Sequence, residues 1–259
     1  LLKACIKNQV NKVVYTSSSA VFGIPKDTPI GPDTLPKPNE AYGEAKLEGE
    51  KICLKAKKDG IMISIIRPRT ILGHGRLGIM QILFEWVEQG KPIPVFDGGQ
   101  NIYQFVHAED LAVACIAAGE AKSSGIYNIG SAKFGKMRQL LEGLILHAKS
   151  KSEIKSVPSR PIQWLMKTLG ALRLSPLAPY HALMYGQKVY FDTKKAESEL
   201  KFKPIYSDLE AICESYDTYI ANKIKNKEKQ IKKSPHLSAV KKGILIFVPS
   251  FLKLIKNKK

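Results

Sequence analysis

The stretch that decides the fold runs Val13-Val14-Tyr15-Thr16-Ser17-Ser18-Ser19-Ala20-Val21-Phe22-Gly23. Its first four residues are β-branched or aromatic, which predicts a short buried strand. A serine cluster follows directly, at the end where the strand leaves the sheet. Serine hydroxyls at this position would hold a hydroxyl or a carbonyl of a substrate, so the stretch predicts both a strand and a candidate site.

About two dozen residues later, Tyr42 and Lys46 lie four positions apart in a helix-prone stretch. Residues i and i+4 share one face of a helix, so the lysine ammonium would lie one turn from the phenol. A nearby positive charge favours the phenolate form, and a phenol tuned in this way can act as a general acid or base near pH 7. The spacing alone is weak evidence, because the same pair occurs by chance in many helices.

The rest of the chain alternates strand-like and helix-like segments, which predicts an α/β fold. We expect Asn39 to cap the helix that carries Tyr42, and this helix to run to about Lys58. Asp110 is expected to cap a later helix. The further strands are predicted at 61–66, 92–95, 104–106 and 126–129, and the further helices at 77–89, 110–119, 134–148 and 209–223.

Four segments, in this order, resemble the extended short-chain dehydrogenase/reductase superfamily, in its epimerase/dehydratase branch. The matching residues are Tyr15–Gly23, Tyr42–Lys46, Arg67-Pro68 with Gly73, and Val106–Ala112. The resemblance implies a partial doubly wound Rossmann-type parallel sheet with a smaller C-terminal substrate lobe. It also implies NAD or NADP as the cofactor, a small-molecule substrate and a homodimer.

That family opens with a strand, a glycine-rich turn and a helix whose N-terminus receives the cofactor pyrophosphate. No such turn precedes Val13, and Leu1–Ile6 has the pattern of the end of a helix. We therefore expect the chain to lack the first βα units of the fold. The domain prediction is a truncated NAD(P)-binding domain over residues 1–222, with its substrate lobe mainly at 74–104 and 150–206, followed by a lysine-rich tail at 223–259.

The resemblance also implies roles for individual residues. Tyr42 is the acid/base, Lys46 supports it and bonds the nicotinamide ribose, and Ser18 is the catalytic serine, with Ser17 and Ser19 as alternatives one residue away. The predicted cofactor-binding residues are Ser17, Tyr42, Lys46, Pro68 and Arg69, and the predicted substrate-binding residues are Ser18, Ser19, Thr70, Arg76 and Tyr103. We expect Tyr42 and Lys46 to face a cleft, and His107 and Asp110 to be structural.

One departure from the family pattern leaves the substrate open. Many nucleotide-sugar epimerases carry an arginine four residues before the histidine that matches His107, and Tyr103 holds that position. A diphosphate without a bidentate arginine loses a strong charge-assisted contact. The first interpretation is an epimerase/dehydratase-type oxidoreductase acting on a (nucleotide-)sugar. The alternatives are a reductase or 3-beta-hydroxysteroid-dehydrogenase-like enzyme on a lipid or polycyclic alcohol, and an inactive fragment.

Most of the net charge of +18 lies in the tail, because residues 223–259 hold twelve lysines against Glu228 alone. Basic residues are not interleaved with aromatic ones, which argues against nucleic-acid binding. The apolar segment Gly243–Leu252 between lysines suits peripheral contact of residues 241–259 with an anionic membrane. The four scattered cysteines form no Cys-x-x-Cys pair, which favours free thiols in a reducing cytoplasm and no metal site.

Overall fold

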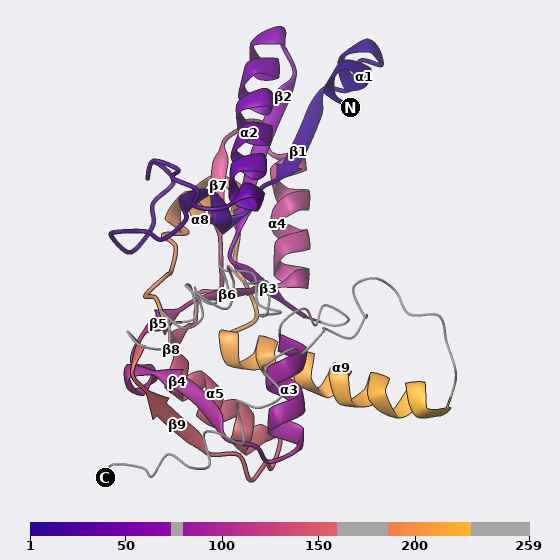
Figure 1. The fold of residues 1–259 in the computed structure, drawn as a ribbon. Coiled ribbons are helices and arrows are strands. Elements are labelled where there is room, and N and C mark those ends of the chain that lie inside the picture. The colour runs from indigo at the N-terminus through magenta and orange to yellow at the C-terminus, as the bar shows by residue number, and fades with distance from the viewer. Residues whose placement is uncertain (74–79, 160–185, 229–259) are drawn as a thin grey trace. The chain divides into compact units, whose positions relative to one another are not determined.

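The computed structural model describes residues 1–73, 80–159 and 186–228, which fall into two compact units (Figure 1). The first unit comprises residues 1–71, 104–133 and 189–207. The second comprises residues 72–103, 134–188 and 208–259. Arg76 and the tail segment 241–259 lie outside the described residues, so the predictions for them stay predictions.

A parallel three-stranded sheet, in the order β1-β2-β7, forms the centre of the first unit. Its strands are β1 (Lys12–Thr16), β2 (Met62–Pro68) and β7 (Ile126–Ile129). The register places Tyr15 beside Ile65 and Ile65 beside Ile126. Among the described strands, β1 pairs only with β2 and so lies at one edge of the sheet.

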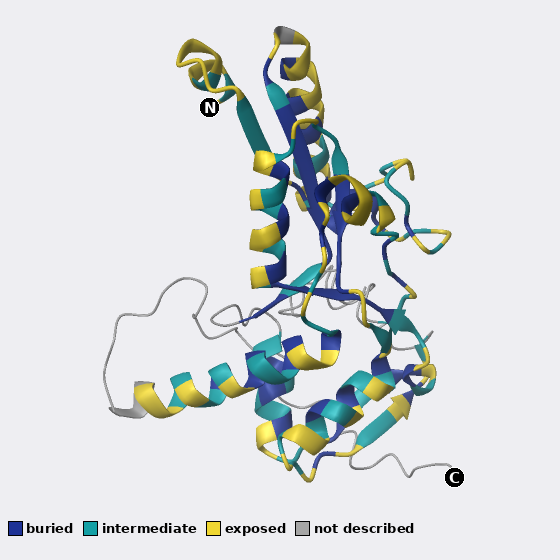
Figure 2. Cartoon of the chain, turned by 180° about the vertical axis from the view of Figure 1, so that it is seen from behind, coloured by how far each residue is buried: buried dark blue, intermediate teal, exposed yellow. Residues whose placement is uncertain are grey.

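Helices cover both faces of this sheet because its strands are apolar on both sides. The helices of the unit are α1 (Leu2–Lys7), α2 (Ala41–Ala56), α4 (Ala108–Glu120) and α8 (Lys194–Leu200). Ile63 and Ile65 belong to the core cluster that α2 closes, whereas Ile66 packs with Ala114 and Ala118 of α4. Successive strand residues point to opposite faces of a sheet, so side chains of β2 contribute to the hydrophobic cores on both faces. Figure 2 shows the buried side of α4 toward the sheet and its exposed side away from it. The predicted α/β fold with a parallel sheet is confirmed.

Short elements complete the first unit. They are the 3-10 turns η1 (Ser19–Phe22) and η2 (Lys57–Asp59) and the paired strands β3 (Thr70–Leu72) and β6 (Phe105–His107). The boundary with the second unit falls within β3, between Ile71 and Leu72. The turn η1 is fully buried and begins at Ser19, the last residue of the serine cluster, so the chain leaves β1 through a fixed conformation.

The two predicted helix caps were both wrong. Glu40, and not Asn39, occupies the cap position of α2, and its side chain makes no capping hydrogen bond. His107 caps α4, because its ring Nδ1 accepts a hydrogen bond from the Glu109 amide. Asp110 instead accepts hydrogen bonds from the main-chain amides of Ile205 and Tyr206, at 2.9 Å and 3.1 Å. Helix-capping rules consider only residues near the helix end in the sequence, so they could not identify Ile205 and Tyr206 as the partners of Asp110.

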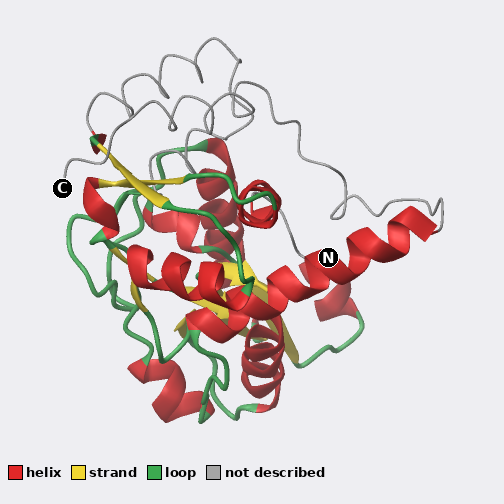
Figure 3. Cartoon of the chain, turned by 90° about the horizontal axis from the view of Figure 1, so that it is seen from below, coloured by secondary structure: helices red, strands yellow, loops and turns green. Residues whose placement is uncertain are grey.

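The second unit combines a parallel pair, β4 (Ile93–Phe96) with β9 (Ile154–Val157), and an antiparallel pair, β5 (Ile102–Tyr103) with β8 (Gly135–Lys136). Its other elements are η3 (Asp97–Gly99) and the helices α3 (Met80–Glu88), α5 (Met137–His147) and α9 (Asp208–Glu228). Phe84 of α3 packs edge-on against Tyr216 of α9. α9 is the long helix of Figure 3 that ends where the grey trace begins. No described helix is both long and apolar enough to cross a bilayer.

Candidate active site

The first turn of α2 lies against the loop that follows the serine cluster. A Cβ on Gly43 would collide with the main-chain carbonyl of Ala20, so glycine permits this close approach. Gly43 itself is buried, whereas its neighbour Tyr42 is 55% exposed. The described residues of the first unit therefore hold the predicted acid/base beside the serine loop without enclosing its phenol.

Lys46 lies one helical turn further along α2 and is fixed at the end of β1. Its ammonium donates a hydrogen bond to the carbonyl oxygen of Thr16 at 2.9 Å. The same nitrogen lies 5.4 Å from the centre of the Tyr15 ring and 5.9 Å from that of the Tyr42 ring. The two rings supply cation–π contacts to the ammonium, which lies between Tyr15 and Tyr42.

A second tyrosine, Tyr15 of β1, also contacts Lys46. Its hydroxyl donates to the main-chain carbonyl of Lys46 at 3.3 Å, and Gly49 leaves room for that hydroxyl. Burial, with the nearby Cys53 and Glu50, raises the pKa of Tyr15 above its ordinary value. Tyr15 therefore stays a neutral phenol at physiological pH and acts as a donor to the helix.

The three serines have different environments. Ser17 is buried, and its hydroxyl donates to Oε1 of Glu50 at 2.6 Å. Ser18 caps η1, since its Oγ accepts from the Ala20 amide at 3.2 Å, and it is half-buried. Ser19 is buried as the first residue of η1. Ser18 is thus the least buried of the three, which is what contact with a substrate requires.

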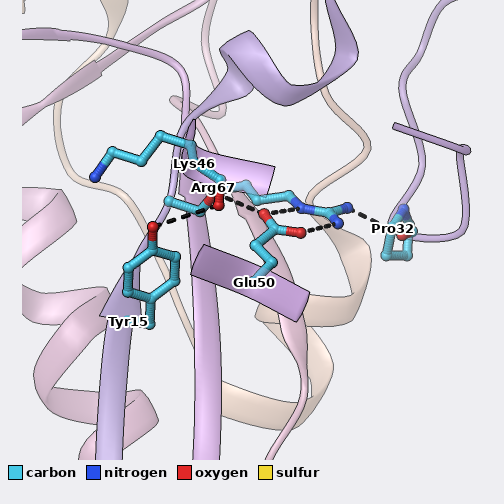
Figure 4. A network of polar contacts seen from close by, with 6 residues as sticks. Tyr15, Pro32, Lys46, Glu50 and Arg67 are labelled. Atoms are coloured by element: carbon cyan, nitrogen blue, oxygen red, sulfur yellow. Dashed lines mark hydrogen bonds and ion pairs between the residues drawn. The ribbon is translucent and has the colours of Figure 1, made fainter. Parts of the chain in front are cut away.

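Glu50 and Arg67, which were not predicted as site residues, form a buried ion pair beside Ser17. Oε1 and Oε2 of Glu50 accept from Nε and Nη2 of Arg67 at 2.8 Å and 2.6 Å (Figure 4). Both side chains are almost fully buried, and the Arg67 guanidinium also lies 4.9 Å from the centre of the Phe22 ring. The sequence held a signal for them. Tyr42, Lys46 and Glu50 follow one another at intervals of four along one helix face, and a buried carboxylate requires a cation.

The residues after β2 differ from one another in exposure. Pro68 ends β2, in register with Ile129 of β7, and is buried. Arg69 is also buried, with Nε donating to the Gln104 carbonyl at 3.2 Å and its guanidinium 5.4 Å from the Phe191 ring centre. Thr70 begins β3 and is half-buried. The Arg69 side chain is thus directed into the first unit, and Thr70 is the more accessible of the two residues.

The predicted substrate residues are divided between the two units. Tyr103 is buried on β5 of the second unit, opposite Gly135 of β8. Ser18, Ser19 and Thr70 belong to the first unit. Within the described ranges, no group of three His, Cys, Asp or Glu side chains is placed to hold a metal ion.

The residues at the end of β1 fit the ribose and nicotinamide end of a dinucleotide. An ammonium has three N–H donors, and in the described part of the chain Lys46 uses one of them, on the Thr16 carbonyl. Two donors are left for the hydroxyls of a ribose. The exposed Tyr42 ring lies next to this ammonium, so both groups are accessible to the same ligand.

Comparison with known proteins places the chain in a family. It is 51% identical over 250 residues to the uncharacterized protein y4nG of Sinorhizobium fredii, across 95% of this chain and 62% of that protein. It is 30% identical to isoform 1 of the 3beta-hydroxysteroid-dehydrogenase/decarboxylase of Arabidopsis thaliana, across 88% of this chain and 58% of that protein. It is 32% identical over 165 residues to the UDP-glucose 4-epimerase of Lactobacillus helveticus, across 55% and 50% of the two chains. The chain thus spans 50–62% of the length of these relatives.

Among solved structures, the fold is similar to the UDP-glucose 4-epimerase of Thermotoga maritima, crystallised with UDP-glucose. The TM-score is 0.68 at 20% identity, across 86% of this chain and 67% of that one. Residues 1–130 match the sequence profile of the NAD dependent epimerase/dehydratase family. This half of the chain carries the serine loop, Tyr42, Lys46 and the Glu50–Arg67 pair, and the chain belongs to the NAD dependent epimerase/dehydratase family.

Proposed function

We propose that this chain supplies the acid/base residues and the nicotinamide end of the cofactor site in an NAD(P)-dependent oxidoreductase of the epimerase/dehydratase type. The observation that carries the proposal is the position of Lys46. Its ammonium is bonded to the Thr16 carbonyl at the end of β1 and lies beside the exposed Tyr42 ring. A cation held in this way can donate hydrogen bonds to the hydroxyls of a ribose while it lies beside the phenol of Tyr42.

In the proposed reaction Tyr42 accepts the proton of a substrate hydroxyl as the alcohol carbon becomes a ketone. A nicotinamide bound there would supply the hydride acceptor for that carbon and, in the reverse direction, the hydride donor. Ser18 donates its hydroxyl hydrogen to the substrate oxygen and holds it within reach of Tyr42. Tyr15 cannot replace Tyr42 as the base, because burial raises its pKa and keeps its phenol protonated.

The substrate of first choice is a sugar, in line with the sequence similarity to a UDP-glucose 4-epimerase. An epimerase would keep its reduced cofactor bound and return the hydride to the other face of the ketone. No free NADH or NADPH would then accumulate during turnover.

A second substrate class is a hydroxysteroid or another polycyclic alcohol. It is favoured by the similarity to a 3beta-hydroxysteroid-dehydrogenase/decarboxylase, which extends over 88% of the chain. Tyr103, at the position where many nucleotide-sugar epimerases carry an arginine, favours the same class, because an uncharged buried phenol does not neutralise a diphosphate. A dehydrogenase of this kind would release reduced cofactor in proportion to the ketone formed.

The test uses the native gene product, with NAD and NADP offered in turn. UDP-glucose and a 3β-hydroxysteroid are supplied as substrates, and reduced nicotinamide is followed by absorbance alongside chromatography of the products. Tyr42→Phe should lower kcat by about 10²–10⁴-fold, whereas Tyr15→Phe should lower it far less. Failure of the protein to quench or enhance NADH fluorescence on titration would contradict the proposal and favour an inactive fragment.

Two further predictions stay open as part of this proposal. A homodimer is expected from the family resemblance alone. Peripheral membrane contact is expected from residues 241–259, which lie outside the described structure. Liposome co-sedimentation of the native protein, compared with a version ending at Asn222, tests the second expectation. Equal binding of the two versions would contradict it.

A further inference from the structure

Helix α2 is joined to the sheet by one buried polar network. Glu50 extends from α2, Arg67 from β2, and Ser17 from the residue after β1. The Glu50 carboxylate accepts from both other residues, at 2.6 Å from Ser17 and at 2.6 Å and 2.8 Å from Arg67. A single carboxylate therefore ties the helix to the carboxyl ends of two adjacent strands.

The direction of these contacts fixes the helix along and around its own axis. Guanidinium and carboxylate meet through two parallel hydrogen bonds, a geometry that specifies both distance and orientation. Nη1 of Arg67 also donates to the Pro32 carbonyl at 3.5 Å, and the Phe22 ring covers the guanidinium, so the arginine is itself held in place. A shift of α2 by a fraction of a turn would break the pair and leave buried charges uncompensated.

The same face of α2 carries the proposed chemistry. Glu50 lies four residues after Lys46 and eight after Tyr42, and side chains at this spacing share one face of a helix. In Figure 4 the Lys46 side chain extends over Tyr15, while Glu50 faces Arg67. The ion pair thus lies at one end of a row whose other members are the ammonium and the phenol.

We propose that Glu50 and Arg67 are positioning residues, whose buried ion pair sets α2 so that Tyr42 and Lys46 stand at the end of β1. The inference rests on the proposed function for its catalytic consequence. Neither residue touches the substrate or the cofactor in this scheme. Their effect on turnover passes through the placement of Tyr42 and Lys46.

The decisive variant replaces the whole pair, Glu50→Leu with Arg67→Met, in the native gene product. Removing both partners leaves no unpaired buried charge, and apolar replacement of a buried ion pair is often tolerated by the fold. The matched control is Glu48→Leu with Lys51→Met, which removes an exposed ion pair of 3.2 Å from the same helix. Thermal melting and circular dichroism establish that each variant is folded.

We expect the buried double variant to lose kcat by about 100-fold, the effect of misplacing a catalytic group by about 1 Å, with the substrate KM changed much less. The exposed double variant should keep the wild-type kcat. A folded Glu50→Leu/Arg67→Met protein with wild-type kcat would overturn the proposal. If this variant does not fold, Arg67→Lys decides, because lysine keeps the charge and loses the two-pronged contact. Wild-type kcat in Arg67→Lys would likewise overturn it.

A second readout does not depend on turnover. The rate of Lys46 acylation by acetic anhydride is measured by mass spectrometry, relative to the exposed Lys55 of the same helix. Release of Lys46 from the Thr16 carbonyl in the buried double variant should raise this ratio, and an unchanged ratio would contradict the positioning role. If the wild-type protein turns over no alcohol with NAD(P), the proposed function fails, whereas the labelling ratio still decides the positioning.

Discussion

Gly43 packs against the main-chain carbonyl of Ala20, so the turn of α2 that carries Tyr42 lies directly on the loop after the serine cluster. The contact connects two segments that each look ordinary in the sequence, a helix and a serine-rich loop. It explains how the start of α2 and the serine loop come to lie against each other, since no side chain separates Gly43 from the Ala20 carbonyl. The first prediction follows from it.

Gly43→Ala should destabilise the protein and lower its activity. Alanine is the better helix former by about 0.5–1 kcal/mol, but its Cβ would meet a backbone atom that cannot move aside cheaply. Melting temperature and kcat should therefore fall together. Gly31→Ala is the control, because its nearest neighbour would be Oγ1 of Thr34 at 3.9 Å, an ordinary contact. A Gly43→Ala protein more stable than wild type would contradict this prediction, because it would show that the loop around Ala20 shifts to accommodate the added methyl group.

Lys46→Met should weaken cofactor binding. A hydrogen bond to a charged group is worth about 1.5–3 kcal/mol, so NADH affinity is expected to fall by roughly 10–100-fold in a fluorescence titration. Lys51→Met serves as the control, since Lys51 is exposed on the same helix and forms an ion pair with Glu48 at 3.2 Å. Equal NADH affinities of the two variants would show that Lys46 does not contribute to cofactor binding.

Asp110→Ala should cost about 3 kcal/mol of unfolding free energy, measured in urea, because the main-chain amides of Ile205 and Tyr206 lose the carboxylate that accepts their hydrogen bonds. His107 stacks on Tyr206 with ring centres 3.8 Å apart, so the same change should loosen that contact. Asp217→Ala provides the comparison. Its carboxylate is exposed and pairs with His147 at 2.9 Å, and such a pair contributes about 0–1 kcal/mol.

Tyr127 should make the first unit sensitive to alkali. Burial, and then its hydrogen bond to Glu199, raise the pKa of Tyr127 from 10.0 to about 12. The folded state therefore favours the neutral phenol. This contribution is complete below pH 10 and is lost as the pH rises toward 12. In Tyr127→Phe, the unfolding free energy should be lower at pH 8 and fall less steeply from pH 10 to 12. Parallel curves for the two proteins would contradict the assignment.

The sequence predicted the elements whose pattern is local and long. The strands at β1, β2 and β7 and the helices α2, α4 and α9 lie where hydrophobic spacing placed them. β5 and β8, each of two residues, were not predicted, because they exist only through pairing with each other across some thirty positions of chain. Asp110 was assigned to a cap for the same reason, since its true partners lie at Ile205 and Tyr206.

For the candidate site, the sequence pointed to groups proposed to touch a ligand and missed the Glu50–Arg67 pair. Tyr42 and Lys46 belong to a recognisable spacing, whereas Glu50 and Arg67 are seventeen residues apart on different elements. Their pairing depends on the register of α2 against β2. A buried carboxylate at the third position of one helix face was the available clue, and its need for a cation could have pointed to the arginine at the end of the next strand.

The position of β1 at an edge of the described sheet has a practical consequence for the handling of this protein. Among the described strands, only β2 pairs with β1. An edge strand displays a row of main-chain donors and acceptors that can pair with any extended polypeptide, including another copy. Lys12 offers little protection, because its ammonium is engaged by the carbonyls of Ala121 and Ser123 rather than extended past the rim. Concentrated solutions should therefore scatter light increasingly with time, and a charged substitution on the outward side of β1 should delay that aggregation.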